Sequence, residues 1–329
     1  QRQMCIRDRD DPGLPMPSPK SIPAPAKWPE SLSVDILKIG TKSENIERLR
    51  KRWTPGERGA LESFGRFLEE GMRDYGDRHN LPGEAGTSRL SPHLHFGEIS
   101  PRRIWHDAAR SDAISGGPQN NPYLRQLVWR EFSYYLLHHF PESVHEPLRK
   151  QFASFPWRDD PAGLEAWKAG RTGYPLVDAG MRELSATGWM HNRVRMVAAS
   201  FLVKHLMIHW LEGAKWFMET LVDADLANNT MGWQWTAGSG ADAAPYFRVF
   251  NPSLQGARFD GNGEYVREWV PELAALPDRY VHSPWKAPDD VLAKAGVRIG
   301  RDYPACVVNH DFARMRALKA FDSLSKNDP

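Results

Sequence analysis

The chain has 329 residues, of which 41% are hydrophobic, so it can bury a large core in one or two domains. Its formal net charge of +2 excludes a strong overall attraction to nucleic acid, and any basic binding site has to be local. The two cysteines, Cys5 and Cys306, exclude a disulfide framework and a thiolate zinc site, and they indicate a reducing compartment. No apolar run reaches membrane-spanning length, so we expect no membrane association.

Residues 1–52 are expected to form an N-terminal extension and linker. The stretch "DDPGLPMPSPKSIPAPAK" is rich in proline and serine and predicts an extended segment. The leading "QRQMCIRDRD" has no hydrophobic period, and we expect these ten residues to be foreign to the natural coding sequence.

Residues 53–329 are predicted to form one all-α domain, because almost every segment has the hydrophobic period of a helix and none alternates as a strand does. Pro55 predicts a helix start. One apolar stripe follows it, made of Leu61, Phe64, Phe67 and Leu68. The stretch "NPYLRQLVWREFSYYLLHHFP" predicts a helix that ends at Pro141, and the segment 174–227 predicts several helices in succession.

Ser91 and Pro92, in "GTSRLSPHLHFGEIS", predict the N-cap and the first residue of a helix. A helix N-terminus beside hydroxyl groups can bind phosphate. Plain capping explains the same residues and is the simpler interpretation.

Gln126, Trp129 and Arg130 have the spacing of one helix face. A flat ring between an amide and a guanidinium suits a nucleobase and its phosphate, while a packed tryptophan beside a surface arginine is the alternative. Further along, "GWMHNRVRM" would place Trp189, Arg193 and Met196 on one face, either lining a pocket or forming an exposed basic edge.

Asp223 and Asp225, in "LVDADLANN", could act in acid–base catalysis, but N-capping of the next helix explains them without it. His205 and His209 are spaced as a metal pair, yet no helical glutamate or thiolate accompanies them. We therefore expect no metal site and interpret the histidines as structural. The same interpretation covers His93, His95, His138 and His139.

The thirteen tryptophans exceed what a core of this size requires. Indole is easily oxidised, so closely spaced tryptophans can pass an electron hole stepwise to a redox cofactor. Trp233 and Trp235 are two positions apart on a helix and point about 200° apart, so they serve different surfaces. Asn229 lies four residues before Trp233 and shares its face.

These segments together resemble the helical FAD-binding domain of the DNA photolyase/cryptochrome family, and most closely the class I cyclobutane pyrimidine dimer photolyases. The resemblance runs from about Trp53 to "YPACVVNHDFARMRAL", nearly the whole folded part. Its motifs are "TSRLS", "WREF", "WKAGRTGYPLVDAGMRELSATGWMHNRVRM", "DADLANN" and "GWQWTAGSGADAAPYFRVFNPSLQG". Their order and spacing carry the resemblance more than any single motif does.

The resemblance implies FAD as the cofactor. Arg195 and Asp223 would pair beside the isoalloxazine, Asp225 would hydrogen-bond the ring, and Asn229 would face flavin N5. The implied cofactor-binding residues are Tyr75, Thr87, Ser88, Arg89, Leu90, Ser91, Arg195, Asp223, Ala224, Asp225 and Asn229.

The resemblance also implies UV-damaged DNA as the partner of a monomeric protein of the bacterial cytosol. The residues that would line the DNA and lesion cavity are Arg78, Gln126, Trp129, Arg130, Asn192, Arg193, Met196, Trp235 and Gln255. An electron relay would run outward from the flavin through Trp233, Trp210 and Trp157.

The implied activity is light-driven repair. Duplex DNA would bind through a local basic rim, and the dimer would flip into the cavity. Photoexcited FADH⁻ would donate an electron to the dimer, the cyclobutane ring would split, and the electron would return. No net redox change results, so no nicotinamide cofactor is expected.

Three departures from the family pattern stand out. The N-terminal α/β domain, which holds most of the antenna site, is absent from this chain, so a second chromophore is expected only for a longer protein. Gln126 stands where class I enzymes carry glutamate, which affects contact with the lesion bases. Cys306 stands where the C-terminal motif usually has a second proline.

Three alternative functions are disfavoured. A (6-4) photolyase would carry histidines where Asn192 and Met196 stand. A cryptochrome photoreceptor tends to differ at Asn229 and Trp129, and no long tail follows Lys326. A cofactor-free helical DNA-binding protein would explain neither the tryptophans nor "DADLANN".

Overall fold

The computed structural model describes residues 12–31, 33, 36, 49–114, 117–241 and 247–324. The regular secondary structure within these ranges is helical and includes no strand, which confirms the predicted all-α class. A single isolated β-bridge there joins Ile299 and Tyr303. The ten leading residues, interpreted as foreign to the coding sequence, lie outside the described residues.

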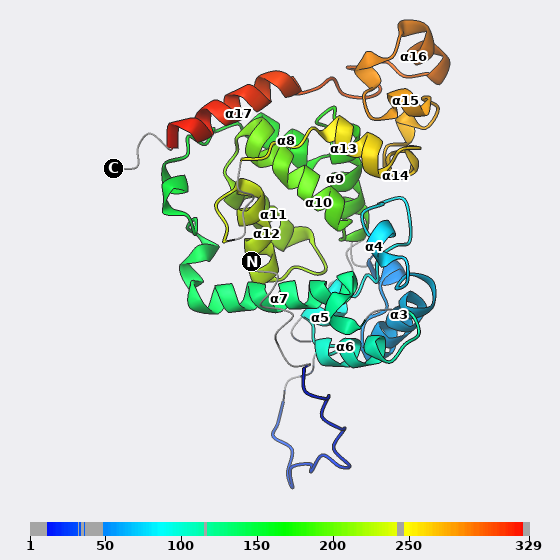
Figure 1. The fold of residues 1–329 in the computed structure, drawn as a ribbon, viewed down its shortest axis with the longest axis vertical. Coiled ribbons are helices and arrows are strands. Elements are labelled where there is room, and N and C mark those ends of the chain that lie inside the picture. Colours follow the sequence, from blue (N-terminus) through cyan, green and yellow to red (C-terminus); the bar gives the residue numbers. More distant parts are fainter. Residues whose placement is uncertain are drawn as a thin grey trace.

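Residues 12–31 contain no helix and are mostly exposed, as their proline-rich composition predicts. One contact anchors the segment, because the carbonyl oxygen of Pro12 lies 2.6 Å from Nε2 of His106. Figure 1 shows the rest of it projecting away from the helices. The domain boundary after residue 52 stays a prediction.

The first helices gather at one end of the molecule, at the lower right of Figure 1. They are α3 (Glu57–Glu70), α4 (Tyr75–Arg78), α5 (Ser91–His95) and α6 (Pro101–Ala109). Their buried side chains form a core of their own, which includes Phe64, Phe67, Ile104 and Trp105. The long helix α7 (Pro122–His139) closes this core with Leu124 and Leu127 and continues along the edge of the body.

The central helices enclose the largest core. They are α8 (Pro161–Lys168), α9 (Pro175–Thr187), α10 (Asn192–Ser200), the π-helical segment η5 (Phe201–Leu206), α11 (Trp210–Thr220) and α12 (Leu226–Ala237). The last helices cover one side of this core in Figure 1. They are α13 (Pro252–Phe259), α14 (Glu264–Trp269), α15 (Asp278–Val281), α16 (Asp289–Ala295) and α17 (His310–Leu324). Short 3₁₀ helices lie between the α-helices along the chain. They are η2 (Pro118–Asn120), η3 (Pro141–Val144), η4 (Lys150–Ser154), η6 (Pro271–Leu273) and η7 (Pro284–Lys286).

Several helices begin in the same way, with a capping side chain followed by proline. Asn121 accepts hydrogen bonds from the backbone N–H groups of the first turn of α7, and Asn251 does the same for α13. Asp160 caps α8 in the same manner. Each cap satisfies amide groups that the helix leaves unpaired, and the proline that follows has the φ angle a first turn needs.

Two predicted helix starts are wrong. α3 begins at Glu57 with Gly56 as its N-cap residue, at φ 93°, so Pro55 lies outside the helix. α5 begins at Ser91 itself, which makes Leu90 the N-cap residue and leaves no side-chain cap. The predicted stripe of α3 holds for Phe64 and Phe67, which are buried, whereas Leu61 is 36% exposed.

α11 and α12 pack closely because Gly213 has no side chain. A Cβ atom there would lie 2.0 Å from the indole of Trp233. The amide of Asn229 ties the same two helices together, since Nδ2 donates to the carbonyl of Ala214 at 2.9 Å. Trp233 and Asn229 therefore share the face of α12 that meets α11, as their spacing predicts.

Gln234, between the two tryptophans, is fully buried and uses its whole amide. Nε2 donates to the carbonyl groups of Ser143 and Glu146, at 2.7 and 2.8 Å. Oε1 accepts from the backbone N–H of Leu148 and from the hydroxyl of Ser239. A glutamine between two tryptophans thus fastens α12 to the segment that follows α7.

His205, in the π-helical segment, has no exposed surface, and its Nε2 lies 2.8 Å from Nδ1 of His310 on α17. Burial lowers the pKa of His205 to about 3, and neighbouring His310 and Arg316 add to the effect. The histidine is neutral in the folded protein at physiological pH, in line with a structural role.

We expect this burial to make folding sensitive to acid. Below about pH 6.5 the unfolded chain protonates His205 while the folded protein does not, so stability falls as the pH drops toward 3. His205→Gln should flatten the dependence by about 1.4 kcal/mol per pH unit near pH 5. Urea unfolding at several pH values between 5 and 7 measures both slopes, and equal slopes would contradict the assignment.

Candidate functional site

A cavity of about 490 Å³ opens between α7, α10, α11 and α12. This volume lies within the range of small-molecule binding pockets. Residues that the sequence assigned to the cofactor and to DNA line it together, namely Gln126, Trp129, Arg130, Asn192, Arg195, Met196, Asp223, Ala224, Asp225, Asn229, Trp233 and Trp235. Two sets of candidates, from α7, α10, α12 and the turn before α12, therefore meet in one place.

Arg195 and Asp223 form an ion pair at this cavity. Nη2 of Arg195 donates to Oδ2 of Asp223 at 2.8 Å, and Nε donates to the carbonyl of Met190 at 2.7 Å. The side chain of Asp223 is 3% exposed, and its other oxygen, Oδ1, is buried without a hydrogen-bond partner. An N-cap role, which the sequence also allowed for Asp223, is therefore wrong.

The unpaired Oδ1 of Asp223 tests whether the site fits FAD. A buried carboxylate oxygen normally accepts hydrogen bonds, so one left open beside a cavity suits a donor carried by a ligand. The isoalloxazine ring and ribityl chain of FAD carry N–H and O–H donors. The guanidinium of Arg195 adds a positive charge next to the same place. These residues fit a flavin.

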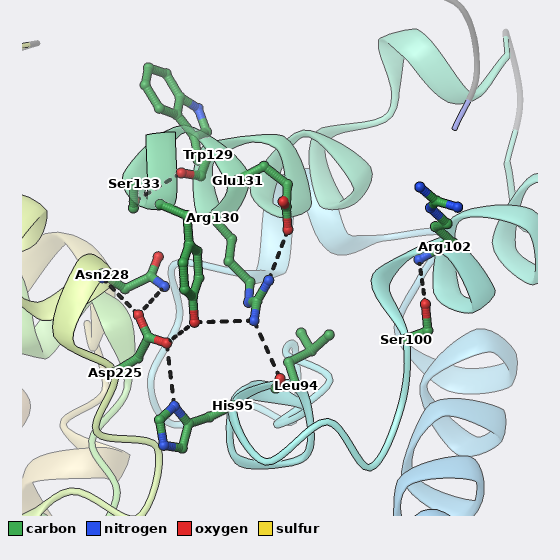
Figure 2. Close-up of polar contacts among 11 residues, drawn as sticks. Leu94, His95, Ser100, Arg102, Trp129, Arg130, Glu131, Ser133, Asp225 and Asn228 are labelled. Carbon is green, nitrogen blue, oxygen red and sulfur yellow. Dashed lines mark hydrogen bonds and ion pairs between the residues drawn. The ribbon is translucent and has the colours of Figure 1, made fainter. Parts of the chain in front are cut away.

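Asp225 is the N-cap of α12, as the sequence predicted, and Oδ1 accepts from the backbone N–H of Asn228 at 2.9 Å. Three more donors converge on the carboxylate: the side chains of Asn228 and His95, labelled in Figure 2, and the hydroxyl of Tyr134. Burial alone would raise the pKa of Asp225, but these hydrogen bonds together outweigh it and hold the pKa below its usual value. Asp225 is therefore ionised.

Trp189 connects the ion pair to the hydroxyl-bearing loop before α5. The guanidinium groups of Arg89 and Arg195 lie 4.7 and 5.8 Å from its ring centroid, and Nε1 donates to Oγ of Ser91 at 3.4 Å. Arg89 has φ 52°, a strained conformation for a residue with a side chain, and such strain is frequent at binding sites. Because α10 begins at Asn192, the face predicted for Trp189 on that helix is wrong.

The remaining cofactor candidates lie around this loop and outside the cavity lining: Tyr75, Thr87, Ser88, Leu90 and Ser91. Oγ of Ser88 accepts from the hydroxyl of Tyr123 and from the backbone N–H of Leu90. Burial raises the pKa of Tyr75 to about 12, so its phenol is neutral. Within the described residues, Trp189 is the contact that links this group to the Arg195–Asp223 ion pair.

Three of the DNA candidates are not at the cavity. Arg78 pairs with Glu84 at 2.6 Å. Arg193 donates to the amide oxygen of Asn80 at 2.6 Å, and its guanidinium lies 4.4 Å from the ring centroid of Phe259. Gln255 lies on α13, and its buried Oε1 has no hydrogen-bond partner.

The tryptophans of the predicted relay lie in or against one core. The ring of His209 lies between the two outer ones, with centroids 5.0 Å from Trp157 and 5.8 Å from Trp210. Trp233 contacts the rings of Phe217 and Trp167 at 5.1 and 6.2 Å. The sequence identified neither His209 nor Trp167 as part of this aromatic group.

Two polar residues of the site were also missed. Tyr134 lies four residues after Arg130, so helical spacing could have identified it. His95 was interpreted as structural because nothing around it in the sequence indicates a metal site. Its contact with Asp225 joins residues 130 positions apart. No local pattern predicts such a contact.

A family model described as the FAD binding domain of DNA photolyase matches residues 123–323. The chain belongs to the DNA photolyase/cryptochrome family. A deoxyribodipyrimidine photo-lyase of Agrobacterium fabrum is 48% identical over 98% of this chain and 67% of its own length. Cryptochrome-1 of Arabidopsis thaliana is 38% identical over 98% of this chain and 48% of its own length.

A solved photolyase structure is also similar. The class III photolyase of Agrobacterium tumefaciens has a TM-score of 0.93 and 48% identity, over 99% of this chain and 68% of its own. The class I assignment made from the sequence thus stays a prediction. The chain spans between about half and two thirds of the length of the relatives named here.

The ranges that the structure describes contain neither a membrane-spanning helix nor a cluster of metal-binding side chains. No helix there is both long and apolar enough to cross a membrane. The same ranges hold no group of three or more histidine, cysteine, aspartate or glutamate side chains arranged to bind a metal ion.

We expect Asp223→Asn to destabilise this photolyase-family domain by about 2 kcal/mol. The change leaves the guanidinium of Arg195 without its anionic partner in a largely buried setting. Asp290→Asn is the matched control, because its pair with Lys294 is exposed on both sides and should change stability by less than about 1 kcal/mol. Urea unfolding of the FAD-free chain measures both, and equal losses would refute the role of burial.

Proposed function

We propose that the protein is a deoxyribodipyrimidine photo-lyase that repairs cyclobutane pyrimidine dimers in DNA under blue light. The observation that carries this proposal is the shared cavity. It brings the Arg195–Asp223 pair and Asn229 together with Trp129 and Trp235, two indole rings suited to stacking against bases. Relatives named deoxyribodipyrimidine photo-lyase at 48% and 45% identity support the same activity.

The cofactor of this proposal is FAD in its fully reduced form. Bound reduced flavin that has absorbed blue light supplies the electron that splits the cyclobutane ring and takes it back afterwards. The protein supplies a fixed environment. Arg195 offers a positive charge, Asp223 an open acceptor, and Asn229 an amide whose Nδ2 is fixed on the carbonyl of Ala214. The loop of Thr87 to Ser91 would hold the phosphates.

The proposed substrate is a dimer flipped out of duplex DNA. A dimer is poorly stacked and paired, so extruding it costs less than extruding an intact base. Trp129 and Trp235 would flank it, and Gln126, Arg130 and Asn192 line the same cavity. Outside the cavity, Arg78, Arg193 and Gln255 would contact the DNA strand around the lesion.

We expect the reduced, FAD-loaded chain to remove thymine dimers from UV-irradiated oligothymidylate under blue light and not in the dark. The measurement of dimer loss is the recovery of absorbance near the thymine maximum. Normal DNA binding without light-dependent repair would favour a photoreceptor instead. That alternative is worth testing because cryptochrome-1 of Arabidopsis thaliana aligns with 98% of this chain.

For the relay we propose electron transfer to oxidised FAD from Trp233, refilled in turn by Trp210 and Trp157. Trp233→Phe should slow light-driven reduction of bound oxidised FAD at least tenfold, since phenylalanine is much harder to oxidise. Repair by chemically reduced protein should change little. Trp285→Phe is the control, because this half-exposed residue lies in a different part of the fold. Normal photoreduction in Trp233→Phe would refute the relay.

A further inference from the structure

The carboxylate of Asp225 is saturated by protein donors. Oδ1 accepts from the backbone N–H and from Nδ2 of Asn228, at 2.9 and 2.7 Å. Oδ2 accepts from the hydroxyl of Tyr134 and lies 3.3 Å from Nδ1 of His95. A carboxylate offers about four lone-pair sites, so this one has little capacity left for a ligand. Asp223, with its open Oδ1, is the contrasting case.

Tyr134 is suited to be a permanent donor to this carboxylate. Burial raises its pKa to about 12, and the hydrogen bond to Asp225 adds to the effect, so the phenol keeps its proton. The guanidinium of Arg130 lies 4.8 Å from the Tyr134 ring centroid, and Nη2 lies 3.4 Å from the phenol oxygen. Arg130 in turn donates to the carbonyl of Leu94 and to Glu131.

These contacts join three helices at one point, as Figure 2 shows. Tyr134 and Arg130 come from α7, His95 from the end of α5, and Asp225 from the start of α12. α5 begins with Ser91 and follows the loop that carries Ser88, while α7 and α12 line the cavity. The two parts of the candidate FAD site thus have a second connection, besides the one through Trp189.

We propose that Tyr134 and His95 are positioning residues of the flavin site, which hold the Asp225 carboxylate ionised and turned toward α5 and α7. Asp225 would then act on the flavin through a fixed negative charge at the cavity wall, and Asp223 would be the open acceptor. This inference rests on the proposed function to the extent that FAD occupies the cavity.

The test compares Tyr134→Phe with Tyr135→Phe. Both remove one hydroxyl from α7, but Tyr135 is 56% exposed and its ring packs against Phe132 and His139, away from Asp225. Loss of a donor leaves the charge of Asp225 less compensated at pH 7. Tyr134→Phe should therefore lower the midpoint potential of bound FAD, alter its absorption bands, and weaken FAD binding roughly three- to tenfold. Tyr135→Phe should match the unsubstituted chain.

His95→Phe and the double variant complete the experiment. Because His95 and Tyr134 donate to the same oxygen, either one partly replaces the other, and the double variant should lose more FAD affinity than the two single variants combined. Urea unfolding of each variant identifies any that do not fold.

Unchanged affinity, potential and spectrum in Tyr134→Phe, or failure of the unsubstituted chain to bind FAD, would overturn the inference. A chain whose flavin potential depends on Tyr134 but which repairs no dimers would refute the proposed repair activity and leave the positioning role standing. The two proposals can thus fail separately.

Discussion

The close approach of α11 to α12 is the constraint on which the candidate site depends. It exists because Gly213 leaves space for the indole of Trp233, and Asn229 bonds the backbone of α11 beside it. Once these helices are in contact, the short turn between them places Asp223 and Asp225 at the cavity wall. The acidic residues, the asparagine and the tryptophan then have one geometry relative to one another.

The two aspartates show how neighbouring residues of one type take different roles. Asp223 faces a single cationic partner and keeps one oxygen open. Asp225, two residues later, is the N-cap of α12 and is surrounded by donors from three helices. The first arrangement suits contact with a ligand, and the second suits a fixed charge that shapes the field in which a ligand sits.

The helical class was predictable from hydrophobic periodicity, and spacing of three and four residues predicted which side chains share a helix face, while the resemblance implied most of the other residues that line the cavity. Gln126, Trp129 and Arg130 meet the cavity because of that spacing. The prediction that Trp189 shares a helix face with Arg193 and Met196 was wrong, because α10 begins only at Asn192. His95 could not be predicted, since its contact with Asp225 depends on how α5 packs against α12, which no local pattern encodes.

The buried amide of Gln234 has a consequence for how this domain tolerates change. Its four hydrogen bonds reach Ser143, Glu146, Leu148 and Ser239. The number of residues between Ser143 and Leu148 therefore has to suit the positions of the donor and acceptor atoms of this one amide. An insertion or deletion in that stretch would leave buried amide groups unpaired, whatever residues it contained. Surface connections usually accept length variation, but the segment from Ser143 to Leu148 is held at a fixed length by its hydrogen bonds to the buried Gln234 amide.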